Sequence, residues 1–451
     1  MSEHHHDHEH NCDSTGTDNT YSRRIFMQQG MAFLSMATTV PMFMQQSAEG
    51  IMLPIGSLVS SQAGIPEDRT LVVIQLAGGN DGLNTIVPYE SSEYYSKRPQ
   101  IAIGKPGTTK YSGGAALEIP GSEGFGLHPN LSGLRELIDN GQAAIMQGVG
   151  YPNPNRSHFT STDIWHTANH SGQGYGWVGK YFDNACSGKP EANQNGSIAI
   201  GNKSPLALYG KTQKAVNFET EELFRWAGTN GSDALENTYD KINRETTIEG
   251  VKKDSQLDFL VRTSLDAQVS SDRIRAAVAK RPLVQYPNGS LSRQLQLIAS
   301  MVRADLPTRV YYASLGGFDT HANQLNSHAN KMQELGDALL AFQKDLGKQG
   351  NTGKVMTMVF SEFGRRVAQN GSAGTDHGTA APMFLIGEHV QPGLLGKHPS
   401  LSKLDQGDLI FNVDFREIYT AILNDWMGAN ATEILGKKYK SASILNNSAL
   451  L

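Results

Sequence analysis

Apolar runs that alternate with helical patterns extend over residues 70–451 and predict an α/β domain. Leu71–Ala77 is a nearly continuous apolar run, which is typical of a central parallel strand covered on both faces. A helical face over Leu131–Ile138, with Asn130 as its predicted N-cap, separates this run from the next one at Ala143–Val149. A strand, a helix and another strand in this order imply a β-α-β unit and a mostly parallel sheet.

The same alternation returns in the last third of the chain. Strands are predicted at Arg309–Leu315, Lys354–Phe360 and Pro382–Ile386. Residues 325–346 carry apolar side chains three and four positions apart, which predicts a long amphipathic helix. His328 lies on the apolar face of this helix and is interpreted as a buried core residue. The remaining predicted elements are short strands at Ser197–Gly201 and Leu206–Tyr209 and helices that begin near Ser290 and Asp414.

The chain divides into three regions by composition. Residues 1–48 form a polar tail and an export segment, residues 49–69 a linker, and residues 70–451 the α/β domain. Within the domain the pattern changes at about residues 190–290, where a polar-amphipathic helical stretch covers about 230–281. We interpret this part as a smaller inserted cap on the main sheet.

The polar tail precedes a pattern that directs proteins out of the cytoplasm. Ser22–Met27 (SRRIFM) matches the twin-arginine motif, in which paired arginines precede a large apolar residue. The mildly apolar stretch Gly30–Met44 is too short and too rich in Ser, Thr and Pro for a membrane span. We therefore expect export by the twin-arginine machinery, a periplasmic or otherwise exported location, and no stable membrane span in the processed form. The tail before the motif is interpreted as a segment outside the fold, with weak metal scavenging as the alternative, because of His4, His5, His6, His8 and His10.

Charge and cysteine content exclude several classes of function. The chain has 39 basic and 44 acidic residues, a formal net charge of -5, and no basic stripe, so we expect no nucleic-acid partner. Of its two cysteines, Cys12 lies in the tail, so a processed chain keeps Cys186 alone. A CxxC redox or zinc motif and an internal disulfide are therefore excluded.

Acidic and histidine residues near glycines stand at the ends of several predicted strands, or in the loop that leads into one. They are Asp81, Asp319, His321, Glu362, Asp376 and His377. Because the carboxyl ends of parallel strands lie at one edge of a sheet, we expect these side chains to converge there. Carboxylate and imidazole ligands suit Zn²⁺ or Mn²⁺, and two such ions can promote displacement at phosphorus. The sequence therefore predicts a site for one or two divalent metal ions.

A candidate nucleophile follows the strand predicted at 143–149. Ser157 stands before the helical-looking segment FTSTDIWHT, where the helix dipole and free N–H groups favour anions. Arg156 is placed to grip an oxyanion and His158 is a third candidate catalytic residue. The alternatives are that Ser157 caps the helix and that Arg156 forms a surface ion pair, and the two roles of Ser157 are compatible.

Three other histidines are weaker candidates for the site. His128 lies near a proline turn, and His166 and His170 are four positions apart, a spacing at which two histidines on one helix face can chelate a metal. Surface positions on a helix are the commoner explanation for the pair.

In the order in which they occur, several segments resemble the bacterial family called domain of unknown function 1501. They are LAGGNDGLNTIVPY, LHPNLSGL, GYPNPNRSHFTSTDIWHT, GGFDTHANQ, FSEFGRR, GTDHGTAAPMFLIG and VDFREIYTAILNDWMG, and they extend from residue 71 to about 428. That family is grouped with the alkaline phosphatase and sulfatase superfamily. The resemblance implies an alkaline-phosphatase-like three-layer α/β sandwich, with helices on both faces of the sheet, and paired divalent metals.

The resemblance also implies roles by position. Asp81 resembles the first metal-ligand aspartate of the superfamily, and Ser157 stands where its nucleophile would be. Asp319 and His321 resemble its Asp and His metal pair, and His377 resembles a late histidine ligand.

Two departures from the superfamily pattern concern the second metal position. Glu362-Phe363-Gly364 stands where an Asp-His-Gly ligand motif is usual, and a phenylalanine side chain cannot bind metal. Asp319 and His321 are two positions apart, where the superfamily spacing is four. Asp376-His377-Gly378 is the alternative Asp-His-Gly motif, and both assignments stay open.

These observations predict an exported, metal-dependent hydrolase of small phosphate or sulfate esters with Ser157 as nucleophile. The alternative is a non-catalytic, metal-stabilised binding or assembly protein of the cell envelope, which Phe363 favours. A nucleotide-binding α/β protein is disfavoured, because no GxGxxG or P-loop motif follows the first strand.

Overall fold

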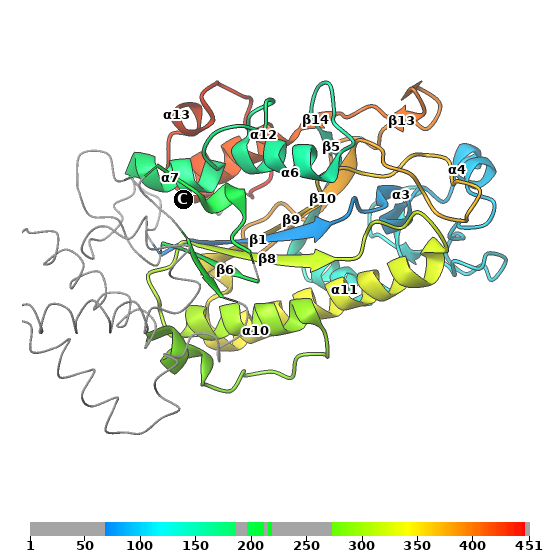
Figure 1. The fold of residues 1–451 in the computed structure, drawn as a ribbon. Coiled ribbons are helices and arrows are strands. Elements are labelled where there is room, and N and C mark those ends of the chain that lie inside the picture. The colour runs from blue at the N-terminus through cyan, green and yellow to red at the C-terminus, as the bar shows by residue number, and fades with distance from the viewer. Residues whose placement is uncertain (1–67, 186–195, 202, 212–214, 219–272, 447–451) are drawn as a thin grey trace, which may run out of the picture. The chain divides into compact units, whose positions relative to one another are not determined.

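The central feature of the computed structural model is a nine-stranded sheet (Figure 1). The structure describes residues 68–185, 196–201, 203–211, 215–218 and 273–446. The strands of the sheet are β1 (Thr70–Ala77), β5 (Ala143–Gly150), β6 (Ser197–Ile200), β7 (Val216–Phe218), β8 (Val310–Gly316), β9 (Val355–Phe360), β10 (Ala381–Ile386), β11 (Gly393–Leu395) and β14 (Val413–Asp414). Their order is β11-β5-β10-β9-β1-β8-β6-β7, and β14 pairs with β5.

One strand runs against all the others. β1 pairs in parallel with β8 and β9, whereas β10 pairs antiparallel with both β5 and β9. The remaining pairs of the sheet, β11 and β14 with β5 and β6 with β7 and β8, are parallel. The start of β10 therefore lies at the same edge as the carboxyl ends of β1, β8 and β9.

Alternating side chains of the strands pack into two hydrophobic cores, one on each face of the sheet. Leu71 and Val73 of β1 belong to one core, and Val72 and Ile74 belong to the other. The first core is covered by α6 (His158–Thr167), α7 (Trp177–Ala185), α12 (Phe415–Ala421) and α13 (Ala431–Leu435), the second by α5 (Ser132–Asp139), α10 (Ser290–Arg303) and α11 (Gln324–Gln349). Figure 1 shows these two sets on opposite faces of the sheet, so the predicted α/β sandwich is confirmed.

The remaining elements are short. They are β2 (Ile86–Val87), β3 (Leu117–Glu118), β4 (Gly126–Leu127), β12 (Leu404–Asp405), β13 (Asp408–Leu409), α3 (Gly82–Thr85), α4 (Ser92–Lys97), two 3-10 turns (Leu206–Leu208 and Thr352–Lys354) and a π-helical turn (Ile422–Trp426) that follows α12.

Most predicted elements are confirmed to within a few residues, and two details are wrong. Leu206–Tyr209 is not a strand: it contains a 3-10 turn whose backbone packs directly on Gly176, where an added Cβ would lie 2.1 Å from the Leu206 carbonyl oxygen. The N-cap of α5 is Leu131, because the side chain of Asn130 instead donates to the Ala329 carbonyl. His328 is buried on the inner face of α11, as predicted.

Several predictions concern residues outside the described ranges. They are the export segment 1–48 with its arginine pair, the linker 49–69 up to residue 67, Cys186 and most of the cap at 190–290. Of the helical stretch predicted at 230–281, residues 273–278 are described and are helical. Within the described part of the chain, no helix is long and apolar enough to cross a membrane.

Candidate metal centre

Loops from four strands meet at the edge where β1, β8 and β9 end and β10 begins, and glycine allows them to touch. Gly78 has φ 120° and an added Cβ would lie 2.5 Å from the Asp319 amide nitrogen. Gly79 has φ 75° and its Cβ would lie 2.4 Å from the ring of Phe363. The Gly78 amide also donates to Glu362 Oε1 at 2.8 Å. The backbone of the GGND loop thus contacts the two neighbouring loops directly. A residue larger than glycine at position 78 or 79 would clash with them.

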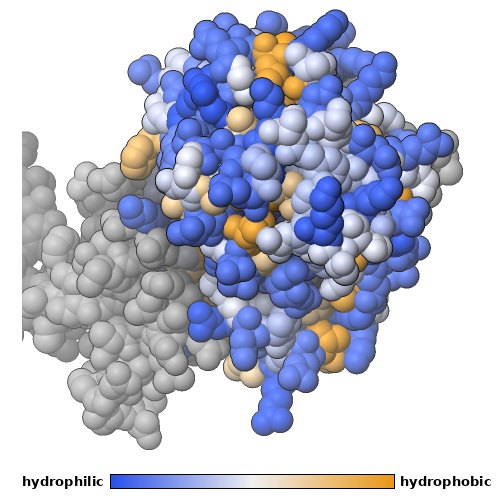
Figure 2. Space-filling model, turned by 90° about the vertical axis from the view of Figure 1, so that its right-hand side faces the viewer, coloured by the Kyte–Doolittle hydropathy of each residue, from blue (hydrophilic) through white to orange (hydrophobic). Residues whose placement is uncertain are grey.

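Three histidines surround one oxygen of Asp319 at this edge. The distances from Asp319 Oδ1 are 3.4 Å to His158 Nε2, 3.1 Å to His321 Nε2 and 3.1 Å to His377 Nε2. The Nε2 atoms of His321 and His377 are 3.0 Å apart. These residues come from the start of α6, the loop after β8 and the loop before β10. Figure 2 views this edge of the molecule, whose surface is mostly hydrophilic with separate apolar patches.

The other ring nitrogen of each histidine is held by an oxygen. His158 Nδ1 lies 2.7 Å from Glu362 Oε1, His321 Nδ1 lies 3.2 Å from Asp376 Oδ1, and His377 Nδ1 lies 2.8 Å from the Arg156 carbonyl oxygen. Carboxylate and carbonyl oxygens only accept, so each Nδ1 carries the proton and donates. In the neutral rings, all three Nε2 atoms therefore present lone pairs toward Asp319.

A fully buried guanidinium joins the loops behind the centre. Arg365 donates to backbone carbonyls of Gly79 at 2.7 Å, Thr375 at 2.8 Å and Phe318 at 3.0 Å, and also to that of Gly78. Its Nη2 donates to Asp319 Oδ1 at 2.7 Å. One side chain thus ties together the loops after β1 and β8 and the loop before β10, and it faces the carboxylate that the histidines surround.

The charges at the centre shift two pKa values in opposite directions. Burial acts to raise the pKa of Asp319, but the hydrogen bond and the positive charge of Arg365 oppose this effect, and the pKa is lowered to about 2. The hydrogen bond from His158 to Glu362 raises the pKa of the His158 ring. Asp319 is therefore ionised at neutral pH.

The donor set fits a divalent metal ion. Imidazole nitrogens and a carboxylate oxygen are zinc ligands, and ligand atoms bound at about 2.1 Å in a tetrahedron stand roughly 3.4 Å apart, close to the distances here. His158, Asp319 and His377 offer ligand atoms that all lie within 4.8 Å of one another. Buried His158 Nε2 makes no hydrogen bond within the described residues. Two neutral Nε2 lone pairs 3.0 Å apart repel each other, and a cation between them removes that repulsion.

Glu362 and Asp376, predicted as metal ligands, lie behind the histidines that they orient. Asp81 is placed differently from both. Its carboxylate accepts from Arg98 Nη1 at 2.5 Å and from the side chain of Gln324, and the Asp81 and Arg98 side chains are 0% exposed. Burial acts to raise the pKa of Asp81, yet the Arg98 charge holds this pKa below its ordinary value. The structure thus brings Asp319, His321 and His377 together with His158, and it places Asp81 in a buried ion pair.

Ser157 is the exposed N-cap of α6, and its side chain makes no capping hydrogen bond. Its two chain neighbours, Arg156 and His158, both contact the centre, one through its carbonyl and one through its ring. The guanidinium of Arg156 points elsewhere and pairs with Asp408, which is 1% exposed. The ion-pair interpretation of Arg156 is therefore the one that the structure supports.

The weaker histidine candidates lie away from the centre. α6 ends at Thr167 and Ala168 is left-handed, so His166 and His170 do not share a helix face, which excludes the alternative of a chelating pair on one helix. The favoured interpretation, two surface positions on a helix, is wrong for His166, which is buried. Buried His166 contacts the Tyr312 hydroxyl at 2.9 Å, and its burial lowers its pKa to about 3. His128 is buried and its Nδ1 accepts from the Asn130 amide at 3.0 Å.

Sequence reasoning missed three residues that build this edge. Neither Arg365 nor Arg98 stands out in the sequence, although an arginine directly after a strand end, as in FSEFGRR, has five donors that can bind loop carbonyls. The sequence identifies Phe363 only as a lost ligand. Its buried ring packs 4.9 Å from the rings of both His158 and His377, so it helps to position two of the histidines.

Comparison with known proteins adds a family and several distant structural likenesses. A family model described as "Protein of unknown function (DUF1501)" matches residues 68–425. No curated protein matches the chain.

Several solved structures are similar to this chain at low sequence identity and low TM-score. The lipoteichoic acid synthase LtaP from Listeria monocytogenes is similar with a TM-score of 0.36 and 10% identity, over 91% of this chain and 83% of that one. A protein in the alkaline phosphatase superfamily from Vibrio parahaemolyticus gives 0.38 and 9%, over 88% and 76% of the two chains. The C-terminal periplasmic domain of EcEptC from Escherichia coli, in complex with Zn, gives 0.34 and 10%, over 74% and 77%. Likenesses at these TM-scores do not bear on activity.

Proposed function

The chain belongs to the family described as protein of unknown function (DUF1501), and we propose from the geometry of the centre that it is a metal-dependent hydrolase of phosphate or sulfate esters. The observation that carries this proposal is the set of three histidine Nε2 atoms around Asp319 Oδ1, each ring held through Nδ1 by an oxygen. Such an arrangement is typical of metal sites, where outer oxygens orient the ligating imidazoles.

His158, Asp319, His321 and His377 are the residues that would hold the ion, and their chemistry suits Zn²⁺ or Mn²⁺. When bound, a divalent ion neutralises charge on ester oxygens during displacement at phosphorus or sulfur. Glu362, Asp376 and the Arg156 carbonyl fix the ring orientations. Arg365 keeps Asp319 ionised and holds its carboxylate toward the histidines.

Ser157 is the proposed nucleophile. It is exposed, its hydroxyl is not used as a cap, and the residues on either side contact the centre. Its oxygen forms the new bond to phosphorus or sulfur and loses its proton, while the bond to the alcohol oxygen breaks and the alcohol leaves with a proton. Water then cleaves the serine ester, which restores the hydroxyl and releases phosphate or sulfate. The first N–H groups of α6 favour the anionic group next to Ser157.

A second candidate function is a non-catalytic, metal-stabilised binding or assembly protein of the cell envelope. The Asp81–Arg98 ion pair and the ring of Phe363 favour it, because the family resemblance implies a metal ligand at each of these positions, whereas Asp81 is held by Arg98 and a phenylalanine cannot bind metal. A single ion is consistent with both candidates, so metal content alone does not separate them.

Export to the periplasm through the twin-arginine machinery is a further part of this proposal. It rests on the arginine pair Arg23-Arg24 and the apolar stretch after it. Replacing both arginines by lysine is expected to retain the protein in the cytoplasm, as measured by cell fractionation. Unchanged export of that variant would contradict the assignment.

The first test is the metal content of the purified protein by mass spectrometry. The expected result is Zn or Mn near one equivalent, lost in Asp319→Ala and in His377→Ala. Asp139→Ala, which removes an exposed carboxylate of a surface ion pair on α5, is the matched control and is expected to retain the metal. A protein that neither contains nor takes up a divalent ion would rule out both candidate functions.

The second test separates the two candidates. With metal bound, the protein is expected to hydrolyse 4-nitrophenyl phosphate or 4-nitrophenyl sulfate. Ser157→Ala is expected to lower kcat by at least about 100-fold while metal content stays unchanged. A metal-loaded protein without activity on either ester class would support the non-catalytic candidate.

A further inference from the structure

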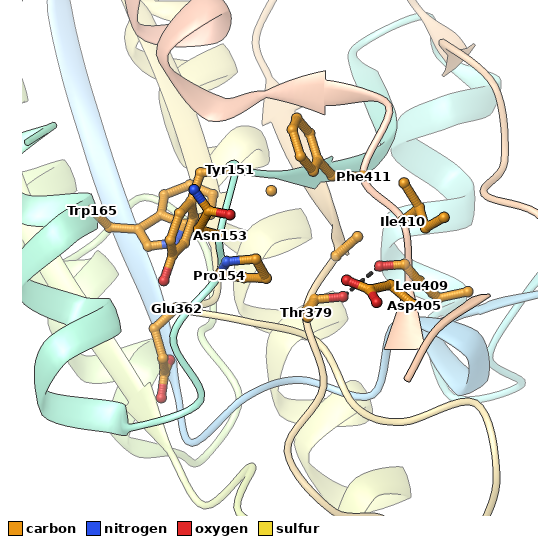
Figure 3. A pocket seen from close by; sticks show the side chains of 12 residues that line it. Tyr151, Asn153, Pro154, Trp165, Glu362, Thr379, Asp405, Leu409, Ile410 and Phe411 are labelled. Carbon is orange, nitrogen blue, oxygen red and sulfur yellow. Dashed lines mark hydrogen bonds between the residues drawn. The ribbon is translucent and has the colours of Figure 1, made fainter. Parts of the chain in front are cut away.

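A pocket of about 110 Å³ lies directly beside the centre (Figure 3). It is bounded on one side by the turn at Tyr151–Pro154 and on the other by the segment after β12, including Leu409–Phe411. Glu362 lines the pocket, and its Oε1 is the atom that holds His158 Nδ1 at 2.7 Å. The residue Glu362 therefore connects the pocket to the support of the candidate metal centre.

The walls of the pocket suit a neutral ring rather than an anion. Aromatic and aliphatic side chains dominate them, namely Tyr151, Pro154, Trp165, Leu409, Ile410 and Phe411. The charged side chains that line it, Glu362 and Asp405, are both acidic and repel a phosphate or sulfate group. An ester bound at the centre would therefore place its anionic group at the histidines and its alcohol part in this pocket.

Trp165 supplies a rigid aromatic wall of the pocket. Its indole is stacked between Phe360, with ring centroids 5.0 Å apart, and Phe415, at 4.3 Å, so its plane is fixed.

We propose that this pocket binds the alcohol part of the substrate and that this alcohol carries one aromatic ring, so that the substrate class is aryl phosphates or aryl sulfates. The assignment of the alcohol to an ester rests on the proposed function, whereas binding of the ring does not. The volume is on the scale of a single ring, since a cavity of about 150 Å³ accommodates benzene.

The binding test uses 4-fluorophenol as probe, the full metal-depleted chain, and ¹⁹F NMR. The wild type is expected to bind the probe, and Ile410→Asp is expected to weaken binding at least tenfold. Ile410 is 48% exposed, so this substitution alters the pocket rim without burying a charge. The matched control is Leu283→Asp, because Leu283 is 40% exposed and does not line the pocket, and it is expected to bind like the wild type. No binding by the wild type, or equal binding by Ile410→Asp, would overturn the proposal.

The kinetic test compares phenyl and methyl esters of the anion that the metal-loaded protein hydrolyses. Ile410→Asp is expected to lower the ratio of kcat/KM for the phenyl ester to kcat/KM for the methyl ester at least tenfold, because repulsion of the anionic group acts on both esters alike whereas loss of the apolar wall acts on the phenyl ester. Equal losses on both esters would overturn the role in substrate recognition. A protein that binds 4-fluorophenol through Ile410 but hydrolyses no ester would refute the proposed function and leave the aryl-binding pocket supported.

Discussion

Two aspartates follow the same Gly-Gly-x-Asp pattern after neighbouring parallel strands and have opposite environments. In the strand register, Ala77 at the end of β1 pairs with Gly316 at the end of β8. Asp81 is four residues past that point and is 0% exposed, with Arg98 as its partner. Asp319 is three residues past it and is 48% exposed, with three histidines and Arg365 around it.

Each aspartate has one arginine, so the difference lies in what else surrounds the carboxylate. Around Asp81 the remaining partner is the neutral amide of Gln324, and the site is closed to solvent. Around Asp319, the other partners are the Nε2 atoms of three partly exposed histidines, which can share the carboxylate with a cation. The same local motif therefore builds a structural ion pair in one place and a candidate ligand in the other.

The largest expected effect is a loss of stability when Asp81, the buried one of the two aspartates, is replaced. Asp81→Ala leaves the Arg98 guanidinium buried without its carboxylate, and breaking such a pair costs about 3–5 kcal/mol of the free energy of unfolding. Urea denaturation of the purified protein measures this loss. A cost below about 1 kcal/mol would show that the fold does not depend on the Asp81–Arg98 ion pair. It would also contradict the difference in role between Asp81 and Asp319.

The next prediction concerns Gly79, the second glycine of the loop after β1. Gly79→Ala forces a Cβ against the buried ring of Phe363, whereas the Cβ of Gly317→Ala would meet the flexible end of Lys331 at 2.9 Å. Both variants strain a positive φ, but only the first overpacks a ring, so we expect losses of about 2–3 and about 1 kcal/mol respectively. Denaturant melts of the two variants give the comparison, and equal losses would refute the packing explanation.

A smaller effect is expected on metal binding when a supporting oxygen is removed. Asp376→Ala deletes the partner of His321 Nδ1 but no proposed ligand. Loss of such an outer contact weakens metal binding by about 10–100-fold. Titration calorimetry with Zn²⁺ measures the dissociation constant, with Asp139→Ala as the control. An unchanged constant would show that Asp376 does not orient His321.

The smallest effect concerns the stability contributed by the exposed aspartate. Asp319→Asn removes a charge that is about half exposed, and exposed ion pairs contribute about 0–1 kcal/mol. We therefore expect a change of less than about 1 kcal/mol in the free energy of unfolding of the metal-free protein. A loss as large as that of Asp81→Ala would mean that both aspartates serve the fold.

The amino-acid pattern alone was sufficient to predict the layers of the fold and the edge where the candidate centre lies. Burial on both faces requires continuous apolar strands and periodic helices, so β1, β5, β8, β9, β10 and α11 are visible in the sequence. Asp319, His321 and His377 were found because they stand next to strand ends. His377 lies at that edge for a reason the sequence does not show, since only the antiparallel direction of β10 brings its preceding loop there.

Which residues of the edge face one another was decided only by the tertiary structure. The strand-end pattern does not distinguish Asp81 from Asp319, because their partners, Arg98 and the histidines, come from other segments of the chain. It also does not reveal Arg365, whose donors are used by carbonyls of three separate loops. Local sequence determines where the chain extends, coils and turns, whereas the direction of a side chain at a loop depends on contacts between segments far apart in sequence.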